Sequence, residues 1–168
     1  MTAPLQKKIC LLGSFAVGKT SLVRRFVHAT FSEKYLTTLG VKVDSKEVRI
    51  GDRDVKLMVW DLAGEDEFQS VRSQYVRGAA GVFYVVDGTR PATAAGVLEL
   101  KHRIDTELGP LPFILLQNKA DLRDEWELDA ARLDSLGMSD WERIETSAAT
   151  GAGVEAAFSR LAGKMVQG

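Results

Sequence analysis

The sequence has a single cysteine and no apolar run long enough to cross a bilayer. Because Cys10 alone cannot form a disulfide within the chain, the composition is typical of a reducing compartment, and we expect a cytoplasmic protein. Cys10 lies in an apolar run, so we expect a buried thiol. The sequence shows no signal peptide, and residues 163–168 contain no cysteine for prenylation, so we expect no membrane anchor in this chain.

The chain also lacks a strong charge of either sign. Its net charge of −1 excludes a general electrostatic attraction to nucleic acid or to an anionic membrane. Internal repeats, low-complexity tracts and linkers are missing as well. Since 45% of the 168 residues are hydrophobic, the chain can bury one sizeable core. We therefore expect one domain over residues 1–168, and a monomer.

The sequence is organised around residues 13–20, which read G-S-F-A-V-G-K-T. An apolar run at 9–12 precedes them and a helix-like run at 21–26 follows, which is the context that a phosphate-binding P-loop needs. Gly13 and Gly18 let successive backbone N–H groups point at phosphate oxygens, and the helix N-terminus adds its positive dipole end. Lys19 supplies a cation for the outer phosphates, and the Thr20 hydroxyl is a suitable ligand for Mg²⁺.

Strand-like and helix-like segments alternate along the rest of the chain. The pattern predicts strands at 5–12, 41–50, 55–60, 81–86, 111–116 and 141–145, and helices at 19–28, 68–77, 93–108, 127–136 and 154–165. This order indicates an α/β fold of the P-loop NTPase type. Its six-stranded, mostly parallel sheet has one antiparallel edge hairpin, with about five helices on both faces.

Three finer expectations accompany this fold. Residues 29–40 and 61–70 have no clean periodicity and are expected to be loops. The alternation of apolar and polar residues in 41–50 slips at 45–47, which predicts a β-bulge. In the helix expected at 127–136, we expect Leu128, Ala131 and Leu136 to face inward.

Polar residues follow several of the expected strands, where the ligands of such sheets bind. Asp61 comes directly after the strand at 55–60 and begins the run D-L-A-G. A carboxylate placed in this way beside a P-loop is suited to hold Mg²⁺. Gly64, at the end of the run, would let a backbone N–H approach a terminal phosphate closely.

The run N-K-A-D at 118–121 follows the strand at 111–116 and indicates a guanine site. The Asn118 amide can pair with purine N7 and O6, and the Asp121 carboxylate can accept two N–H donors of guanine. Adenine presents a lone pair where Asp121 needs a donor, and sites built on such donors reject the wrong analogue by roughly 10⁴–10⁵. The run Thr146-Ser147-Ala148 follows the last strand, and we expect Ser147 to brace Asp121.

Taken together, these motifs resemble those of the Ras superfamily of small GTPases. The set consists of G-S-F-A-V-G-K-T, D-L-A-G, N-K-A-D and E-T-S-A, with Thr38 between the first two. The resemblance covers essentially the whole chain and is greatest to the Rab branch, from the segments at 38–41, 57–61 and 74–79. It implies a switch that binds GTP or GDP with Mg²⁺ and hydrolyses GTP. Exchange factors, activating proteins and effectors would bind switch I, at about 29–41, and switch II, at about 61–77. No nucleic-acid partner is implied.

The resemblance also assigns residues to roles. Mg²⁺ would be held by Thr20, Thr38 and Asp61, and the catalytic positions would be Lys19, Thr38, Gly64 and Glu65. Tyr35 would cover the phosphates and Phe31 would pack edge-on against guanine. The complete set expected around the nucleotide is Gly13, Phe15, Ala16, Val17, Gly18, Lys19, Thr20, Ser21, Phe31, Tyr35, Thr38, Gly64, Asn118, Lys119, Asp121, Leu122, Ser147, Ala148 and Ala149.

Three residues depart from the family pattern. Phe15 stands at a P-loop position that is usually small, and it would crowd the entry of an arginine finger, which is worth about 10³–10⁵ in rate. Glu65 replaces the glutamine that orients the attacking water; an ionised glutamate only accepts hydrogen bonds. Slow hydrolysis is therefore predicted. Ala149 replaces a lysine near the base, which predicts weaker nucleotide affinity.

Three interpretations remain open. The first is a GTPase switch with slow turnover. The second is a hydrolysis-deficient, GTP-bound scaffold of the same fold, which Phe15 and Glu65 favour. The third is an ATP-dependent small-molecule kinase, which the run at 118–121 disfavours. The nucleotide that copurifies with the protein would separate them.

Overall fold

The computed structural model describes residues 4–14, 16–27, 34–36, 41–62 and 72–167. Within them the strands are β1 (Leu5–Gly13), β2 (Lys34–Leu36), β3 (Val41–Ile50), β4 (Arg53–Leu62), β5 (Gly81–Asp87), β6 (Phe113–Asn118) and β7 (Arg143–Glu145). They form one sheet in the order β2-β3-β4-β1-β5-β6-β7. The pairs β1–β4, β1–β5, β5–β6 and β6–β7 are parallel, whereas β2–β3 and β3–β4 are antiparallel.

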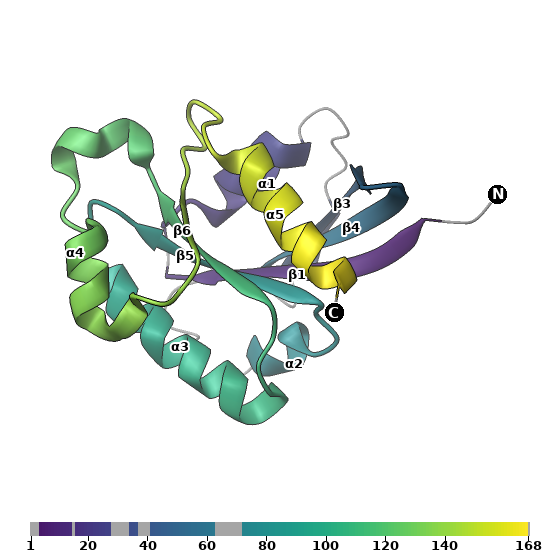
Figure 1. The fold of residues 1–168 in the computed structure, drawn as a ribbon, viewed down its shortest axis with the longest axis horizontal. Helices are drawn as coiled ribbons and strands as arrows, with labels where there is room; N and C mark the ends of the chain where they lie inside the picture. Colours follow the sequence, from purple (N-terminus) through teal and green to yellow (C-terminus); the bar gives the residue numbers. More distant parts are fainter. Residues whose placement is uncertain (1–3, 15, 28–33, 37–40, 63–71, 168) are drawn as a thin grey trace.

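Helices cover both faces of the sheet (Figure 1). The helices α1 (Lys19–Val27) and α5 (Val154–Gln167) lie on one face, and α2 (Arg72–Val76), α3 (Ala92–Leu108) and α4 (Ala130–Leu133) lie on the other. A 3₁₀ helix at Ala120–Glu125 follows β6, and a π-type turn at Asp134–Met138 follows α4. Among the described helices, none is long and apolar enough to cross a membrane.

The sheet divides the core into two layers because alternate side chains of a strand point to opposite faces. On the α1/α5 face, Phe26 stacks on Phe158 with ring centroids 3.8 Å apart, and Phe83 meets Phe158 edge-on at 4.8 Å. On the other face, Cys10 is fully buried, as expected, and Tyr84 packs near Trp141. Every residue of β5 is buried, which is why its sequence, G-V-F-Y-V-V-D, reads as one apolar run until its last residue.

The predicted class and the mostly parallel sheet are confirmed, and all six predicted strands are present, with β2 as a seventh. Three details were wrong. The strand β2 lies within 29–40, where a loop was expected. No bulge interrupts β3, whose register with β4 runs unbroken from Val41↔Leu62 to Ile50↔Arg53. The helix expected at 127–136 is reduced to α4, and within it Ala131 is exposed while Leu133 is buried.

The apparent slip in β3 has a simple physical cause. Val41 and Val43 pack on the core layer of α3, whereas Val48 and Ile50 pack on the layer of α1 and α5. The apolar side chains therefore change face along the strand although the backbone register does not. The even-numbered face stays the more buried one, and Lys42 and Asp44 occupy it near the start of the strand. Lys46 shares the face of Val48, and its ammonium donates to the Phe26 carbonyl at 2.8 Å.

The stacked phenylalanines yield a prediction about stability. Phe158→Ala removes a fully buried ring that contacts α1 and β5, so the free energy of unfolding is expected to fall by about 3–5 kcal/mol. Urea denaturation measures this fall. Ser159→Ala, at the exposed neighbouring position on α5, is the control and should change it by less than about 0.5 kcal/mol. Equal effects of the two substitutions would contradict the prediction.

Candidate functional site

The site is built at the carboxyl ends of the parallel strands, starting with the loop after β1. Gly13 ends β1 so close to β5 that a Cβ on it would lie 2.5 Å from the Val85 carbonyl oxygen. Gly18 has a φ of +103°, and a Cβ there would also overlap the Asn118 amide. Ala16 adopts a φ of 64°, a left-handed conformation that is unusual for a residue with a side chain. The loop is therefore held in a conformation that few residues other than glycine adopt.

Lys19 opens α1 and folds back over this loop. Its side chain is buried, and its ammonium donates to the carbonyls of Gly13 at 3.0 Å and Ser14 at 3.2 Å. The charge is thus held at the centre of the loop rather than extended into solvent. This is the arrangement expected of the P-loop lysine.

Thr20 and Asp61 meet beside Lys19. The Thr20 hydroxyl donates a hydrogen bond to the Asp61 carboxylate, which the parallel pairing of β4 with β1 brings to the end of the sheet. Burial raises the pKa of Asp61, while the Thr20 hydrogen bond and the nearby Lys19 charge oppose that rise. Two of the three predicted Mg²⁺ ligands are therefore adjacent.

The residues present fit a magnesium ion that a nucleotide brings with it. Within the described residues, no group of three or more His, Cys, Asp or Glu side chains gathers to form a complete cage. One carboxylate and one hydroxyl are nevertheless the usual protein share for Mg²⁺ when phosphates and water complete the octahedron. Thr20 supplies the hydroxyl and Asp61 supplies the carboxylate.

The other end of the site centres on Asn118, the last residue of β6. Its buried amide donates to the Val17 carbonyl at 2.8 Å and accepts from the Thr146 hydroxyl at 3.0 Å. Sequence reasoning expected this amide to face a purine. In the structure it joins the P-loop to the segment that follows β7.

Asp121 lies beyond Asn118, and the Ser147 hydroxyl donates to its carboxylate at 2.7 Å, which confirms the predicted brace. A hollow of about 380 Å³ opens here, a size typical of small-molecule sites. Its walls are formed by Gly18, Ser21, Asn118, Lys119, Asp121, Leu122, Ala148 and Ala149, all of which were expected around the nucleotide. Leu122 is also an exposed large apolar side chain, as a residue that covers a bound base would be.

Sequence reasoning missed the buried carboxylate of Asp87. The Lys119 ammonium lies 2.9 Å from it, and Thr89 donates to it through its backbone N–H at 2.8 Å and its hydroxyl at 2.7 Å. Burial opposes ionisation, but these hydrogen bonds outweigh it and hold the pKa of Asp87 below its ordinary value. Asp87 is the last residue of an apolar strand and Asp61 is the next-to-last residue of another, and that similar position could have identified Asp87.

Trp126 is a second residue that was missed. Its indole N–H donates to the Lys119 carbonyl at 2.7 Å, and the ring lies against Gly88, where a Cβ would overlap it. Lys119 itself has a left-handed φ of 71°. Trp126 and Asp87 therefore hold the backbone and the ammonium of Lys119.

Some predicted positions lie outside the described residues: Phe15, Phe31, Thr38, Gly64 and Glu65. Tyr35 is in β2, of which only the backbone is described. Their predicted roles stay predictions. The structure brings together the others, from the P-loop, from β4, from the run after β6 and from the segment after β7.

This fold and site define a P-loop nucleotide-binding protein of the α/β class. A profile of the Ras family matches residues 8–167. The chain is 32% identical to the human Ras-related protein Rab-32 over 169 residues, covering 95% of this chain and 74% of that protein. It is 35% identical to Rab7 of Drosophila melanogaster over 162 residues, covering 92% and 78%. The chain therefore belongs to the Ras family, is Rab-like, and is a GTP-binding small GTPase.

The bond between Thr146 and Asn118 yields a prediction. Thr146→Val keeps the shape of the side chain but leaves the buried Asn118 oxygen without its donor, which is expected to lower the free energy of unfolding by about 1–3 kcal/mol. Denaturation of the nucleotide-bound protein measures this. The control is Thr106→Val, on the exposed part of α3, which should cost less. A smaller loss at Thr146 than at Thr106 would contradict the prediction.

The pKa of Asp87 predicts a pH dependence. Since the folded pKa lies below the ordinary value of 3.8, Asp87 stabilises the fold fully above that pH and loses its contribution as the pH falls through the lower, folded value. The difference in unfolding free energy between wild type and Asp87→Asn should be constant above about pH 5 and shrink below about pH 4. Urea titrations at several pH values test this. A difference that stays the same at every pH would count against the assignment.

Proposed function

We propose that this protein is a switch that binds GTP or GDP with Mg²⁺ and hydrolyses GTP slowly. The observation that carries the proposal is the meeting of Thr20 and Asp61 beside the ammonium of Lys19. These three side chains supply a metal-binding pair and a phosphate-binding cation at one place. The P-loop backbone around them has the glycines that close approach of a phosphate requires.

Each end of the proposed site has a distinct task. Lys19 and the N–H groups at the start of α1 bind the outer phosphates. Thr20 and Asp61, with Thr38, would hold Mg²⁺, which neutralises charge on the phosphate oxygens when it is bound. Asp121 accepts hydrogen bonds from the guanine edge, and Lys119 and Leu122 flank the base. Gly18 of the P-loop and Asp121 of the proposed base site both line the same hollow, in keeping with this division.

The switching element in the proposal is the pair of segments at about 29–41 and 61–77. Thr38 and Gly64 would contact the terminal phosphate and its metal only when GTP is bound, so the two segments take different arrangements in the two nucleotide states. Exchange factors, activating proteins and effectors would read that difference. The protein would act as one domain over residues 1–168, in the cytoplasm and as a monomer.

Slow hydrolysis follows from two residue types. Phe15 would hinder a trans arginine finger, and Glu65 would place a carboxylate, which only accepts hydrogen bonds, where a water must be oriented. The same two residues favour the second candidate, a GTP-bound scaffold that hardly hydrolyses. The two candidates differ only in the rate of one step.

We expect the purified protein to carry GDP, identified by chromatography of the nucleotide released on denaturation. Copurified GTP would favour the scaffold, and an adenine nucleotide would contradict both candidates. In a single-turnover GTP assay on the protein alone, Glu65→Gln should raise the rate by about tenfold because it restores one donor to the water. Phe15→Gly should raise the rate reached with an activating protein that supplies an arginine finger. The control is Lys56→Gln, on β4 and remote from the P-loop. Unchanged rates in both variants would overturn the roles given to Phe15 and Glu65.

A further inference from the structure

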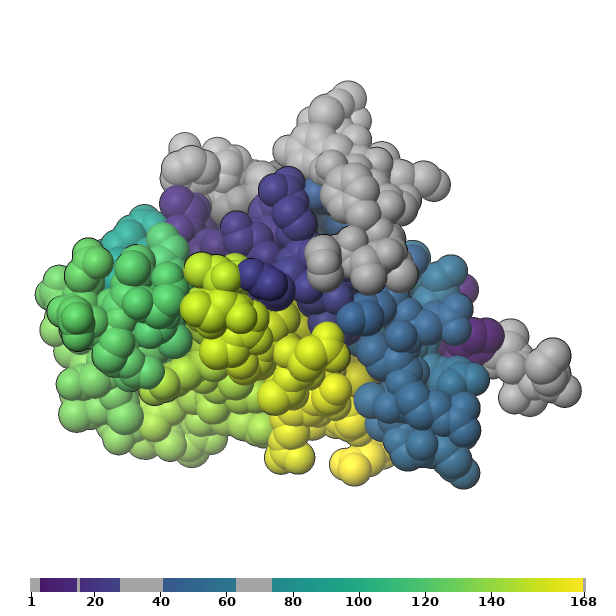
Figure 2. Space-filling view, turned by 90° about the horizontal axis from the view of Figure 1, so that it is seen from above, coloured from purple at the N-terminus to yellow at the C-terminus, as the bar shows by residue number. Residues whose placement is uncertain are grey.

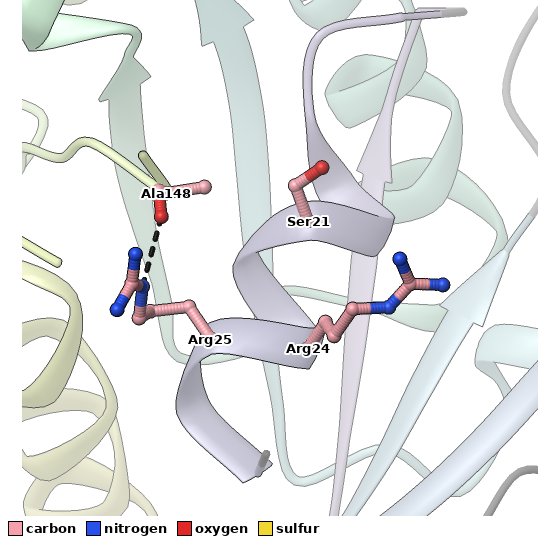
Figure 3. A pocket seen from close by; sticks show the side chains of 4 residues that line it. All are labelled: Ser21, Arg24, Arg25 and Ala148. Carbon is pink, nitrogen blue, oxygen red and sulfur yellow. Dashed lines mark hydrogen bonds between the residues drawn. The ribbon is translucent and has the colours of Figure 1, made fainter. Parts of the chain in front are cut away.

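A second hollow, of about 340 Å³, lies between α1 and the segment that follows β7. It is lined by Ser21, Arg24, Arg25 and Ala148 (Figure 3). The two arginines are neighbours on α1, yet Arg25 turns toward the segment after β7 and Arg24 turns away from it. In the space-filling view, that segment lies directly beside α1 (Figure 2). The pair therefore offers one arginine that bonds across the hollow and one that does not.

Arg25 makes two hydrogen bonds across the hollow. Its Nε donates to the Ala148 carbonyl at 2.9 Å, and its Nη2 donates to the Ala149 carbonyl at 2.6 Å. Both bonds have a charged donor, so they are stronger than bonds between neutral groups. They span 123 and 124 residues of sequence, so they join α1 to a segment that the sheet alone does not attach to it.

The peptide unit between Ala149 and Thr150, whose carbonyl accepts from Arg25, is also linked to Asp121. The Ala149 carbonyl and the Thr150 N–H belong to one peptide unit, and in a trans peptide they point in opposite directions. The Thr150 N–H donates to the Ser147 hydroxyl at 3.1 Å, and that hydroxyl donates to the Asp121 carboxylate at 2.7 Å. Every donor in the series therefore points the same way, from the guanidinium to the carboxylate.

Such a series is cooperative. Each bond polarises the next, and the two ends carry opposite charges, so the arrangement is stabilised along its whole length. Its effect is to fix the Ser147 hydroxyl as a donor to Asp121, which leaves the rest of that carboxylate to accept from a ligand. A neutral side chain at position 25 would leave the Ala149 peptide held from one side only.

We propose that Arg25 is a positioning residue for guanine selection, which acts on Asp121 through the Ala149–Thr150 peptide and Ser147. The proposal rests on the proposed function, in which Asp121 accepts from the guanine edge. It adds a residue on the outer face of α1 to the machinery that distinguishes purines. It also gives the segment at 148–149, which has only alanine side chains, a means of being held in place.

A different role for Arg25 is conceivable from the contacts alone, namely a strut that only attaches α1 to its surroundings. Lys46 shows what such a strut looks like, since its ammonium donates to the Phe26 carbonyl at the end of α1 and to Glu155 of α5, remote from Asp121. A strut would affect all nucleotides equally. A positioning residue would affect most the ligand that uses Asp121 most.

The test compares GDP with inosine diphosphate, which lacks the 2-amino group of guanine and so has one donor fewer for Asp121. Dissociation rates of both nucleotides are measured by stopped-flow displacement for wild type, Arg25→Ala, Arg25→Lys and Arg24→Ala. We expect Arg25→Ala to release GDP about tenfold faster and inosine diphosphate only about twofold faster. Arg25→Lys should restore part of the selectivity, and Arg24→Ala should match wild type.

A double-mutant cycle that combines Arg25→Ala with Ser147→Ala tests whether the effect of Arg25 reaches Asp121 through Ser147. Since Ser147→Ala already interrupts the series, adding Arg25→Ala to it should change the ratio of the two rates by less than about twofold. If Arg25→Ala accelerates both nucleotides equally, as we expect for Lys46→Met, or if its effect on selectivity persists fully without Ser147, the proposal is overturned. Wild type that holds GDP no better than ADP would instead overturn the proposed function, and the inference with it.

Discussion

The side-chain amide of Asn118 is the interaction on which the rest of the site depends. It is buried at the end of β6, donates to the P-loop at Val17 and accepts from Thr146 after β7. Backbone bonds run beside it, from the Thr146 N–H to the Gln117 carbonyl and from the Ala120 N–H to the Thr146 carbonyl. Because a buried amide left unpaired is costly, three segments distant in sequence are forced into one geometry. The proposed phosphate-binding and base-binding ends of the site are thereby joined through one side chain.

Parallel strand pairing explains why so much of this site could be predicted from the sequence. The carboxyl ends of β1, β4 and β6 must lie at one edge, so a lysine, a hydroxyl and a carboxylate that follow them must converge. The contacts of Thr20 with Asp61 and of Ser147 with Asp121 could be anticipated on that basis. Each prediction needed only the order of the elements and the chemistry of the residue that follows a strand.

The errors in the predicted fold have a different origin. They arise where tertiary contacts, rather than the local pattern of apolar and polar residues, decide the structure. The phase slip in β3 reflects a change in the face that carries the apolar side chains, and nothing in the alternation of residues distinguishes that from a bulge. The helix at α4 ends in a π-type turn at Gly137, whose φ of 92° interrupts a periodic pattern that would otherwise continue. β2 has three residues, too few for periodicity to be detectable.

Two of the residues that were missed in the site, Arg25 and Trp126, share one property: their partners are backbone carbonyls. Arg25 bonds to carbonyls 123 and 124 residues away, and Trp126 bonds to the carbonyl of Lys119. A side chain that donates to a backbone carbonyl can have any residue type as its partner, since every residue has a backbone carbonyl. The residue type of the partner therefore does not reveal the contact. Motifs therefore reveal the groups expected to touch a ligand and side chains such as Ser147 that belong to a motif, whereas groups that hold a motif through its backbone carbonyls emerge only from the folded chain.

These observations bear on the choice between the two candidate functions, a switch that hydrolyses GTP slowly and a scaffold that stays bound to GTP. Its nucleotide-holding groups are extensively braced: Lys19 by two carbonyls, Lys119 by Asp87, and Asp121 by Ser147. Two of the three positions that depart from the family pattern, Phe15 and Glu65, would affect the attack of water, whereas the third, Ala149, would affect the affinity for the nucleotide. Retention and hydrolysis are separate rates. In the proposed function, Phe15 and Glu65 would therefore lengthen the GTP-bound interval by slowing hydrolysis, without loosening the contacts that hold Lys19, Lys119 and Asp121 in place.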